Sequence, residues 1–265
     1  MARLPFAGEL GKLEAALRYS LLGGGKRIRP VLCLAVGEAL GRETEEVLPA
    51  ACSLELVHTF SLVHDDLPAL DDDELRRGQP SAHVRFGEGV AILAGDALLT
   101  EAFRLALTYP TPEPARELAQ ATAGMIGGQY VDVTTDGDLD SQSLAELHDL
   151  KTGRLLAASV TCAAAVADLP ASERAPWAAF GREVGLLFQI VDDILDATGT
   201  AAELGKTPGK DEAAGKVTYV SLHGLDRARE LADEARSRVN ARLEALPADT
   251  SVLASIVEAI RERNA

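Results

Sequence analysis

Residues 54–74 read LELVHTFSLVHDDLPALDDDE, a segment in which apolar residues spaced as in a buried helix end in a dense group of aspartates. Five aspartates fall within the nine residues 65–73, where like charges repel one another. Acidic residues also carry the wrong sign for the C-terminal end of a helix dipole. A hard cation such as Mg²⁺ would offset both costs, because carboxylate oxygens are its preferred protein ligands. Taken alone, the segment is also typical of a solvated helix end.

A second acidic group, FQIVDDILD at residues 188–196, lies within another apolar helical pattern. Asp192 and Asp196 are four residues apart and share one helix face, with Asp193 beside them. Carboxylates among apolar neighbours are expected to be paired or bound to metal. Two such groups on apolar segments make simple surface solvation a poor explanation for both, and they predict two metal sites.

Basic residues are concentrated in other segments. The sequence GGGKRIRP at residues 23–30 places Lys26 and Arg29 where a glycine turn enters a helix, which predicts a site for a small anion. Its spacing is not that of a nucleotide-binding P-loop. Arg76 and Arg77 follow the first acidic group, where neutralising the aspartates is their simplest role. Metal sites and separate cationic sites together suit two diphosphates, with an apolar cavity sheltering a hydrocarbon cation.

The overall composition narrows the function further. The 265 residues include 26 Lys and Arg against 41 Asp and Glu, a net charge of −15, which argues against nucleic acid as a partner. Cys33, Cys52 and Cys162 fit no disulfide or metal spacing, so reduced thiols and a cytoplasmic location are expected. Charged residues within 1–22 interrupt any apolar signal-peptide core, so no signal peptide is expected, and the uncharged stretch 155–167 is too short to span a membrane.

Apolar residues recur at helical spacing along almost the whole chain, and no convincing strand alternation is present. Aromatic residues make up only 4% of the chain, which also favours helices packed through aliphatic side chains. We predict one all-α domain over residues 1–265. Its expected helices cover residues 9–22, 30–40, 44–66, 88–107, 113–134, 142–166, 172–199, 216–243 and 249–263.

These motifs resemble those of the trans-isoprenyl diphosphate synthases, the polyprenyl synthetase family, and most closely the bacterial farnesyl diphosphate synthases. The resemblance implies an all-α helical bundle of the isoprenoid synthase type that forms a homodimer. It places the active site in a central cavity between two aspartate-rich helices. Only 25 residues precede Lys26, so the N-terminal helix is expected to be shortened. The shared segments are GGGKRIRP (23–30), HTFSLVHDDLPALDDDELRRGQPSAH (58–83), LAGDALL (93–99), GGQYVDV (127–133), KTG (151–153), FQIVDDILDATG (188–199) and the lysines of the following loop.

The resemblance also implies roles for individual residues. The metal ligands would be Asp65, Asp66, Asp71, Asp192, Asp193 and Asp196, holding about three Mg²⁺ ions. The allylic diphosphate would contact Arg76, Lys151, Thr152, Gln189, Lys206 and Lys216, and isopentenyl diphosphate would contact Lys26, Arg29, His58 and Arg77. The residues expected to carry catalysis are Asp65, Asp66, Asp71, Arg76, Lys151, Asp192, Asp193 and Lys206. By residue chemistry alone, His58 on its apolar helix is more typical of a structural histidine.

The implied reaction ionises an allylic diphosphate, dimethylallyl or geranyl, adds the double bond of isopentenyl diphosphate to the cation, and loses a proton. Phe60 and Ser61 precede Asp65 by five and four residues, about one helical turn below the metal site. An aromatic residue there, together with the Leu67-Pro68 insertion, resembles enzymes that stop at fifteen carbons. We therefore expect farnesyl diphosphate as product, with Phe60 blocking the tail.

Other functions stay open at this point. A geranylgeranyl or geranyl diphosphate synthase would belong to the same family. A terpene cyclase would lack GGGKRIRP and the second acidic motif, and a helical scaffold explains none of the basic positions. A non-catalytic partner subunit of a heteromeric prenyl synthase would be expected to have lost acids in one motif, whereas both motifs are intact here.

Overall fold

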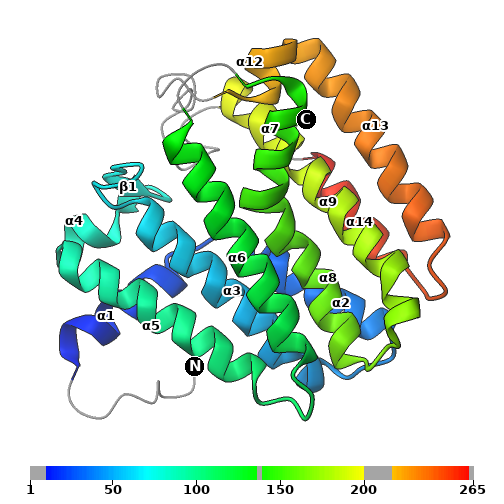
Figure 1. Ribbon diagram of the computed structural model, residues 1–265, viewed down its shortest axis with the longest axis horizontal. Helices are drawn as coiled ribbons and strands as arrows, with labels where there is room; N and C mark the ends of the chain where they lie inside the picture. Colours follow the sequence, from blue (N-terminus) through cyan, green and yellow to red (C-terminus); the bar gives the residue numbers. More distant parts are fainter. Residues whose placement is uncertain (1–9, 136–138, 200–216, 263–265) are drawn as a thin grey trace.

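The computed structural model of the chain describes residues 10–135, 139–199 and 217–262, and this part is almost entirely helical (Figure 1). The helices are α1 (Gly11–Leu22), α2 (Ile28–Ala39), α3 (Thr44–Asp65), α4 (Ala82–Phe86), α5 (Glu88–Ala106), α6 (Glu113–Thr134), α7 (Ser141–His148), α8 (Arg154–Val166), α9 (Ala171–Thr198), α12 (Tyr219–His223), α13 (Leu225–Glu244) and α14 (Ser251–Glu262). A π-helical turn, η1 (Asp149–Gly153), joins α7 to α8. The all-α prediction is confirmed.

Several local features differ from the sequence prediction, among them the short helix α4, which was not expected. The helix expected over 142–166 contains the π-helical turn η1, and the helix expected over 216–243 begins as α12 and breaks at Gly224. Gly224 has φ of 82°, a left-handed conformation that glycine adopts at little cost and that ends α12. A short antiparallel hairpin of β1 (Leu75–Arg76) and β2 (Gln79–Pro80) follows the first acidic group.

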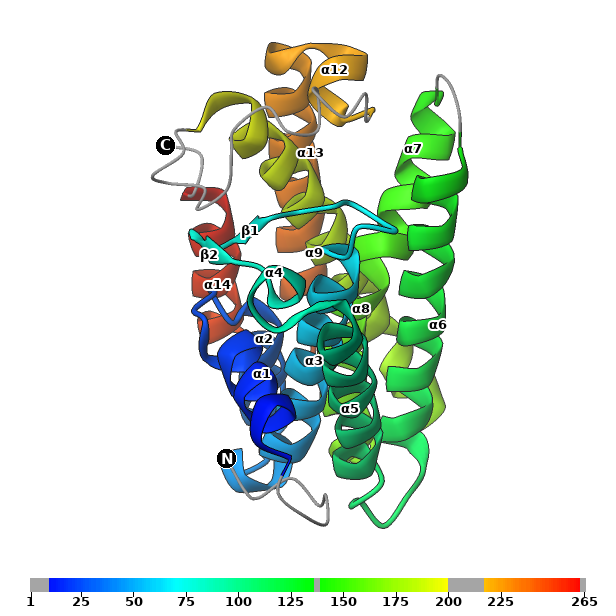
Figure 2. The same cartoon turned by 90° about the vertical axis from the view of Figure 1, so that its left-hand side faces the viewer.

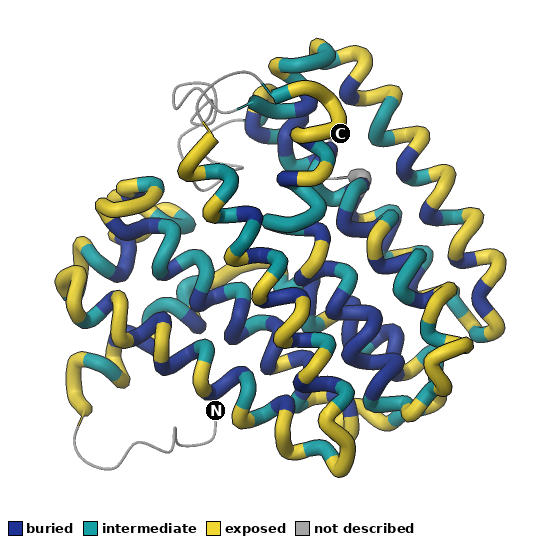
Figure 3. The backbone as a smooth tube through the Cα atoms, viewed as in Figure 1, coloured by how far each residue is buried: buried dark blue, intermediate teal, exposed yellow. Residues whose placement is uncertain are grey.

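Helix α3 lies at the centre of the bundle, where it packs against α2, α5 and α8. Its Leu54 and Val57 are fully buried, and burial of such a side chain stabilises the fold by about 2 kcal/mol. Figure 3 shows buried segments concentrated along the interior helices, while α13 exposes much of its outer surface. A glutamate pair, Glu43 and Glu46, forms the capping box that begins α3.

By length and composition, α3 is the one helix in the described ranges that is apolar enough to cross a membrane. However, 61% of the tested window is buried inside the bundle, and core helices have the same composition. This is weak support for a membrane span.

Helix α9 joins the interior to the outer layer, because it packs against α8 on one side and α13 on the other. Trp177 and Phe180 of α9 are fully buried and anchor it in the core. Figure 2 shows α6 and α7 on one side of the molecule and α14, α2 and α1 on the other. The acidic segments of α3 and α9 are far apart in the sequence, yet both contribute residues to one cavity.

Candidate active site

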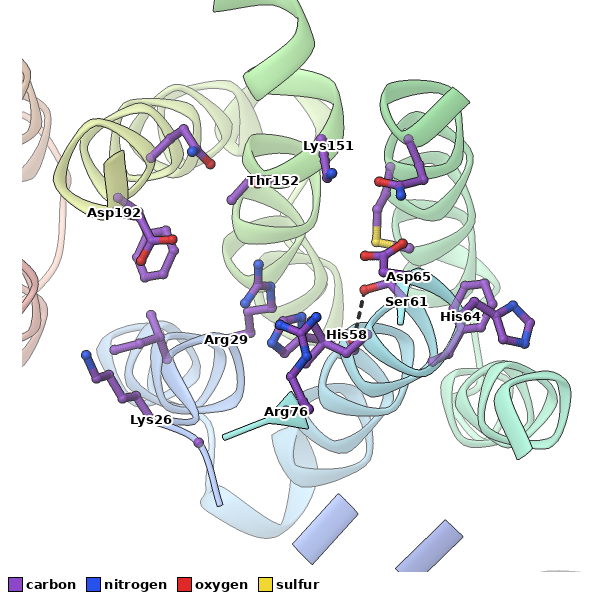
Figure 4. Close-up of a pocket in the computed structure, with 18 of the residues that line it drawn as sticks. Lys26, Arg29, His58, Ser61, His64, Asp65, Arg76, Lys151, Thr152 and Asp192 are labelled. Atoms are coloured by element: carbon purple, nitrogen blue, oxygen red, sulfur yellow. Dashed lines mark hydrogen bonds between the residues drawn. The ribbon is translucent and has the colours of Figure 1, made fainter. Parts of the chain in front are cut away.

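A cavity of about 1580 Å³ lies between α2, α3, α5, α6, η1 and α9. Figure 4 shows Asp192 of α9 and Asp65 of α3 on opposite sides of this cavity, with Arg29 pointing into the space between them. Residues far apart in the sequence therefore share one site. Twelve of the residues predicted from sequence line it: Lys26, Arg29, His58, Phe60, Ser61, Asp65, Arg76, Arg77, Lys151, Thr152, Gln189 and Asp192.

Of the six remaining predicted residues, the structure describes four. Asp66, Asp71, Asp193 and Asp196 are not among the residues that line the cavity. Asp66, Asp193 and Asp196 are nearly inaccessible, with 2%, 5% and 6% exposure. Lys206 and Lys216 lie outside the described residues, so their predicted contacts with a diphosphate stay predictions.

The first acidic group is shaped by a turn at the end of α3. The backbone N–H of Asp71 donates to the carbonyl of Asp65 at 2.9 Å, and that of Asp73 donates to the carbonyl of Asp66 at 3.1 Å. Asp72 adopts φ of 48°, a left-handed conformation that aspartate tolerates better than most residues. Residues 66–70 therefore form a turn that brings Asp71 back beside Asp65.

Asp65 and Asp66 are neighbours in sequence, but Asp65 lines the cavity and Asp66 is bonded to Arg76. Burial raises the pKa of the Asp65 carboxyl to about 6, an effect opposed by Lys151 and reinforced by Asp71. Asp66 instead accepts a hydrogen bond from Nε of Arg76 at 3.0 Å, with a second Arg76 nitrogen also bonded. Burial raises the pKa of Asp66 as well, since desolvation outweighs the hydrogen bond from Arg76.

The second acidic group lies in the last third of α9, and its aspartates also divide between cavity and interior. Asp192 lines the cavity, whereas Asp193 accepts hydrogen bonds from Nε2 of Gln189 at 2.7 Å and from the backbone N–H of Tyr219 at 2.8 Å. Asp196 is buried one turn further along the helix. In both motifs the first aspartate faces the cavity and the next one binds protein.

Arg29 of α2 and His58 of α3 line the cavity together with Arg76 and Arg77 of the hairpin segment. Burial lowers the pKa of Arg29 to about 10, partly offset by Glu55 and Asp192. The pKa of His58 falls well below its usual value because the ring is buried and four arginines lie nearby. His58 is therefore neutral at pH 7, a state in which one ring nitrogen donates and the other accepts. The surrounding positive charge suits an anion such as a diphosphate.

Arg27 and Arg77 order this cationic region. Arg27, in a left-handed conformation with φ of 53°, pairs with Glu55, a cavity residue that sequence reasoning did not select. The Arg77 guanidinium donates to the carbonyl of Gly24 and packs against Gly25. A β-carbon at Gly25 would lie 2.6 Å from Arg77 Cζ, so the glycine turn is required for this approach.

Lys151 and Thr152 are presented by the π-helical turn η1. A β-carbon at Gly128 of α6 would lie 2.4 Å from the backbone nitrogen of Lys151, and one at Gly185 of α9 would lie 2.9 Å from Cα of Gly153. Two glycines thus let the backbones of α6 and α9 close on η1 from both sides. π-Helical turns inside helices often occur at functional sites.

Asp132 is the acidic partner of Lys151 and was missed by sequence reasoning. Its carboxylate accepts a hydrogen bond from Nζ of Lys151 at 2.6 Å, and Asp132 is one residue before the end of the GGQYVDV segment. Gln129, three residues earlier on the same helix, also lines the cavity. This spacing places both on one helix face, the signal that sequence analysis did not use.

Phe60 lies in the cavity wall at 7% exposure. Its ring packs edge-to-face against His64, with centroids 4.9 Å apart, and Nε2 of His64 lies 3.0 Å from the carbonyl of Ile92. Ser61 also lines the cavity, and its hydroxyl donates to the carbonyl of His58 at 2.9 Å. A large and a small residue therefore lie side by side one turn below Asp65.

A sequence model of polyprenyl synthetase matches residues 11–260, in agreement with this geometry. The chain belongs to the polyprenyl synthetase family. It is therefore an enzyme, a prenyltransferase, as its acidic and cationic cavity indicates. The family resemblance inferred from the motifs is confirmed.

Two plant members of the family illustrate the relationship in sequence. The chain is 47% identical over 244 residues to geranylgeranyl pyrophosphate synthase 7, chloroplastic, of Arabidopsis thaliana, covering 88% of this chain and 70% of that protein. It is 48% identical over 238 residues to heterodimeric geranylgeranyl pyrophosphate synthase large subunit 1, chloroplastic, of the same plant, covering 84% and 64%. The chain thus spans about two thirds of the length of these relatives.

A solved member of the family supports the fold. Geranyltransferase from Helicobacter pylori, complexed with magnesium and isoprenyl diphosphate, superposes with a TM-score of 0.81 at 34% identity. The match covers 98% of this chain and 90% of that one.

The donor atoms of the site fit magnesium shared with a substrate. Within residues 10–135, 139–199 and 217–262, no three acidic, histidine or cysteine side chains converge closely enough to hold an ion by themselves. Asp65 and Asp192 nevertheless present carboxylates to the same cavity. Mg²⁺ commonly takes one or two carboxylates and completes its shell with water and phosphate oxygens, so this arrangement fits it.

Proposed function

We propose that the enzyme condenses isopentenyl diphosphate with dimethylallyl or geranyl diphosphate, in the presence of Mg²⁺, to give all-trans farnesyl diphosphate. The observation that carries this proposal is that carboxylates from two motifs and several cationic side chains line one cavity. Asp65 and Asp192 suit a diphosphate bridged by metal, and Arg29, His58 and Arg77 suit a second diphosphate bound by side chains.

The chain's own residues orient the two substrates. Asp65, Asp71 and Asp192 would hold Mg²⁺, which when bound neutralises charge on the departing diphosphate. Lys151, held by Asp132, and Arg76 add positive charge on that side. The allylic C–O bond breaks, the double bond of isopentenyl diphosphate attacks the cation, and a proton leaves to the released diphosphate. No side-chain base is needed, and the apolar cavity wall excludes water from the cation.

Product analysis with isopentenyl and dimethylallyl diphosphates, with and without Mg²⁺, tests this reaction. A metal-dependent fifteen-carbon diphosphate is the expected product. Absence of condensation with either dimethylallyl or geranyl diphosphate would overturn the proposal in favour of a non-catalytic partner subunit.

We further propose that Phe60 sets the length of the product. Its ring lines the cavity about one helical turn before Asp65 and packs edge-to-face against His64. Phe60→Leu and Phe60→Ala should yield twenty-carbon and longer products, because each opens space below the reacting end of the chain. Val57→Ala, a fully buried change on the same helix away from the cavity, is the matched control for lost packing. Unchanged products in both Phe60 variants would contradict this role.

A geranylgeranyl diphosphate synthase is the second candidate, favoured by the names of the plant relatives. A twenty-carbon product from the unaltered enzyme would establish it and would overturn the farnesyl assignment while leaving the chemistry intact.

We also propose that the enzyme is a cytoplasmic homodimer. The free cysteines Cys33, Cys52 and Cys162 support a reducing compartment. Two neighbouring apolar side chains of α5, Ile92 and Leu93, are exposed outside the cavity and support self-association. Analytical ultracentrifugation of the enzyme and of Leu93→Glu tests this, with a monomeric wild-type enzyme as the contradicting result.

A further inference from the structure

Asp193 has contacts that its neighbour Asp192 lacks. Asp193 is 5% exposed and is not among the residues that line the cavity. One oxygen accepts a hydrogen bond from Nε2 of Gln189 at 2.7 Å, and the other accepts one from the backbone N–H of Tyr219 at 2.8 Å. Asp193 therefore connects a cavity-lining side chain of α9 with the first residue of α12.

The contact with Asp193 determines which way the Gln189 amide faces. An ionised carboxylate only accepts hydrogen bonds, so the Gln189 atom nearest to it must be the NH₂ group. The carbamoyl oxygen then lies on the opposite side of the group, and Gln189 lines the cavity. Among the described residues no donor bonds that oxygen.

Tyr219 holds the Asp193 carboxylate in this orientation. Its N–H belongs to the first turn of α12, which begins with a capping box formed by Thr218 and Ser221. The Tyr219 ring also packs near His148 of α7, with centroids 5.4 Å apart. The donor to Asp193 is therefore fixed by a cap and by ring packing, and rotation of the carboxylate is restricted.

We infer that Asp193 is a positioning residue that turns the carbamoyl oxygen of Gln189 toward the allylic cation. This inference rests on the proposed function, since only ionisation of the allylic diphosphate creates that cation. A fixed dipole whose negative end faces a developing positive charge stabilises the transition state without reorganising. Asp193 thus acts through Gln189, while Asp192 faces the cavity directly.

The first measurement compares kinetic constants. Asp193→Asn keeps the shape and still offers an acceptor to Tyr219, but its amide pairs equally well with either orientation of Gln189. We expect kcat to fall about tenfold, with KM for both diphosphates and the half-saturating Mg²⁺ concentration unchanged. The kcat of Gln189→Leu should fall by a similar factor. The double variant should have a kcat no lower than that of Gln189→Leu alone.

The second measurement uses binding rather than activity. The probe is an ammonium analogue, in which a protonated nitrogen replaces the carbon that becomes positive, bound with inorganic diphosphate and Mg²⁺. Calorimetry should show Asp193→Asn weakening this analogue about tenfold and a neutral analogue of equal shape less than twofold. Thr218→Ala weakens the cap that fixes the Tyr219 donor but leaves Gln189 its carboxylate partner, so it should lower kcat by less than Asp193→Asn does.

Several results would overturn the positioning role. Additive losses in the double variant would show that Asp193 does not act through Gln189. A rise in half-saturating Mg²⁺ equal to that of Asp192→Asn would make Asp193 a metal ligand, and an equal loss in Thr218→Ala would assign the effect to α12. If the wild-type enzyme itself fails to condense the substrates, the proposed function is overturned instead.

Discussion

The acidic group at the end of α3 and the one within α9 each contain a buried aspartate, but different protein groups bond to it. In each, the first aspartate faces the cavity and the second is bonded to protein. Asp66 pairs with Arg76, ten residues further along the chain. Asp193 accepts a hydrogen bond from the backbone N–H of Tyr219, which is twenty-six residues further along the chain and beyond the end of α9. Neighbouring aspartates in a motif therefore need not share a role.

The difference lies in how each group is stabilised. The first ends a helix, where a tight turn returns Asp71 and the following hairpin delivers Arg76. The second lies inside a continuous helix, which offers its side chains no free backbone donors. Its buried carboxylate is instead satisfied by Gln189 one turn earlier and by α12. The first motif is locally complete, whereas the second requires the C-terminal part of the bundle.

The largest effect should come from the two cavity-facing aspartates. Asp65→Asn and Asp192→Asn each remove a carboxylate that we assign to Mg²⁺, and kcat should fall by about a thousandfold or more. Steady-state product formation measures this. Asp72→Asn, an exposed aspartate of the same turn, is the control and should retain wild-type activity. If either variant kept a kcat within tenfold of wild type, the two motifs would not be functionally equivalent.

A smaller effect, on stability, should follow from Asp66→Asn. The change leaves the guanidinium of Arg76 without its buried carboxylate partner, and the free energy of unfolding should fall by about 2 kcal/mol. Urea unfolding of the metal-free protein measures it, again against Asp72→Asn. A loss below about 0.5 kcal/mol, the usual range for surface changes, would mean that Arg76 does not depend on Asp66.

The smallest effect is the pH dependence of metal binding. The pKa of Asp65 is raised from 3.8 to about 6 in the folded protein, so ionising it opposes folding, and its contribution to stability declines as pH rises through this interval. Mg²⁺ binds the ionised form, and its affinity should therefore drop about tenfold between pH 7 and pH 5. Calorimetric titration should show this drop in wild type. Asp65→Asn should flatten it, and a wild-type profile independent of pH would contradict the assignment.

The helices themselves were largely readable from the sequence. Residues 113–134 were predicted as a helix and form α6 with the same bounds, and residues 88–107 form α5 to within one residue. Helical spacing of apolar residues is a local property, so the all-α class and most helix positions followed from it. The exceptions, η1 and the break at Gly224, depend on close backbone approaches and on a left-handed glycine.

The composition of the site was also predictable, because its chemistry requires carboxylates and cations in recognisable groups. Twelve predicted residues line one cavity, which confirms that the separate motifs come together. The partners of those residues were not predictable: Asp132 for Lys151 and Glu55 for Arg27 lie on other elements. Nothing in the local sequence marks an acid as the partner of a distant base.

The sequence by itself determined that this protein is a helical bundle carrying two acidic groups and separate basic segments. Only the tertiary structure decided which aspartate of each pair faces the cavity and which one is bonded to protein. Periodicity places residues on the faces of a helix, but the environment of a face is set by the elements packed against it. Asp65 and Asp66 are adjacent in sequence, but in the folded bundle Asp65 lines the cavity and Asp66 is bonded to Arg76.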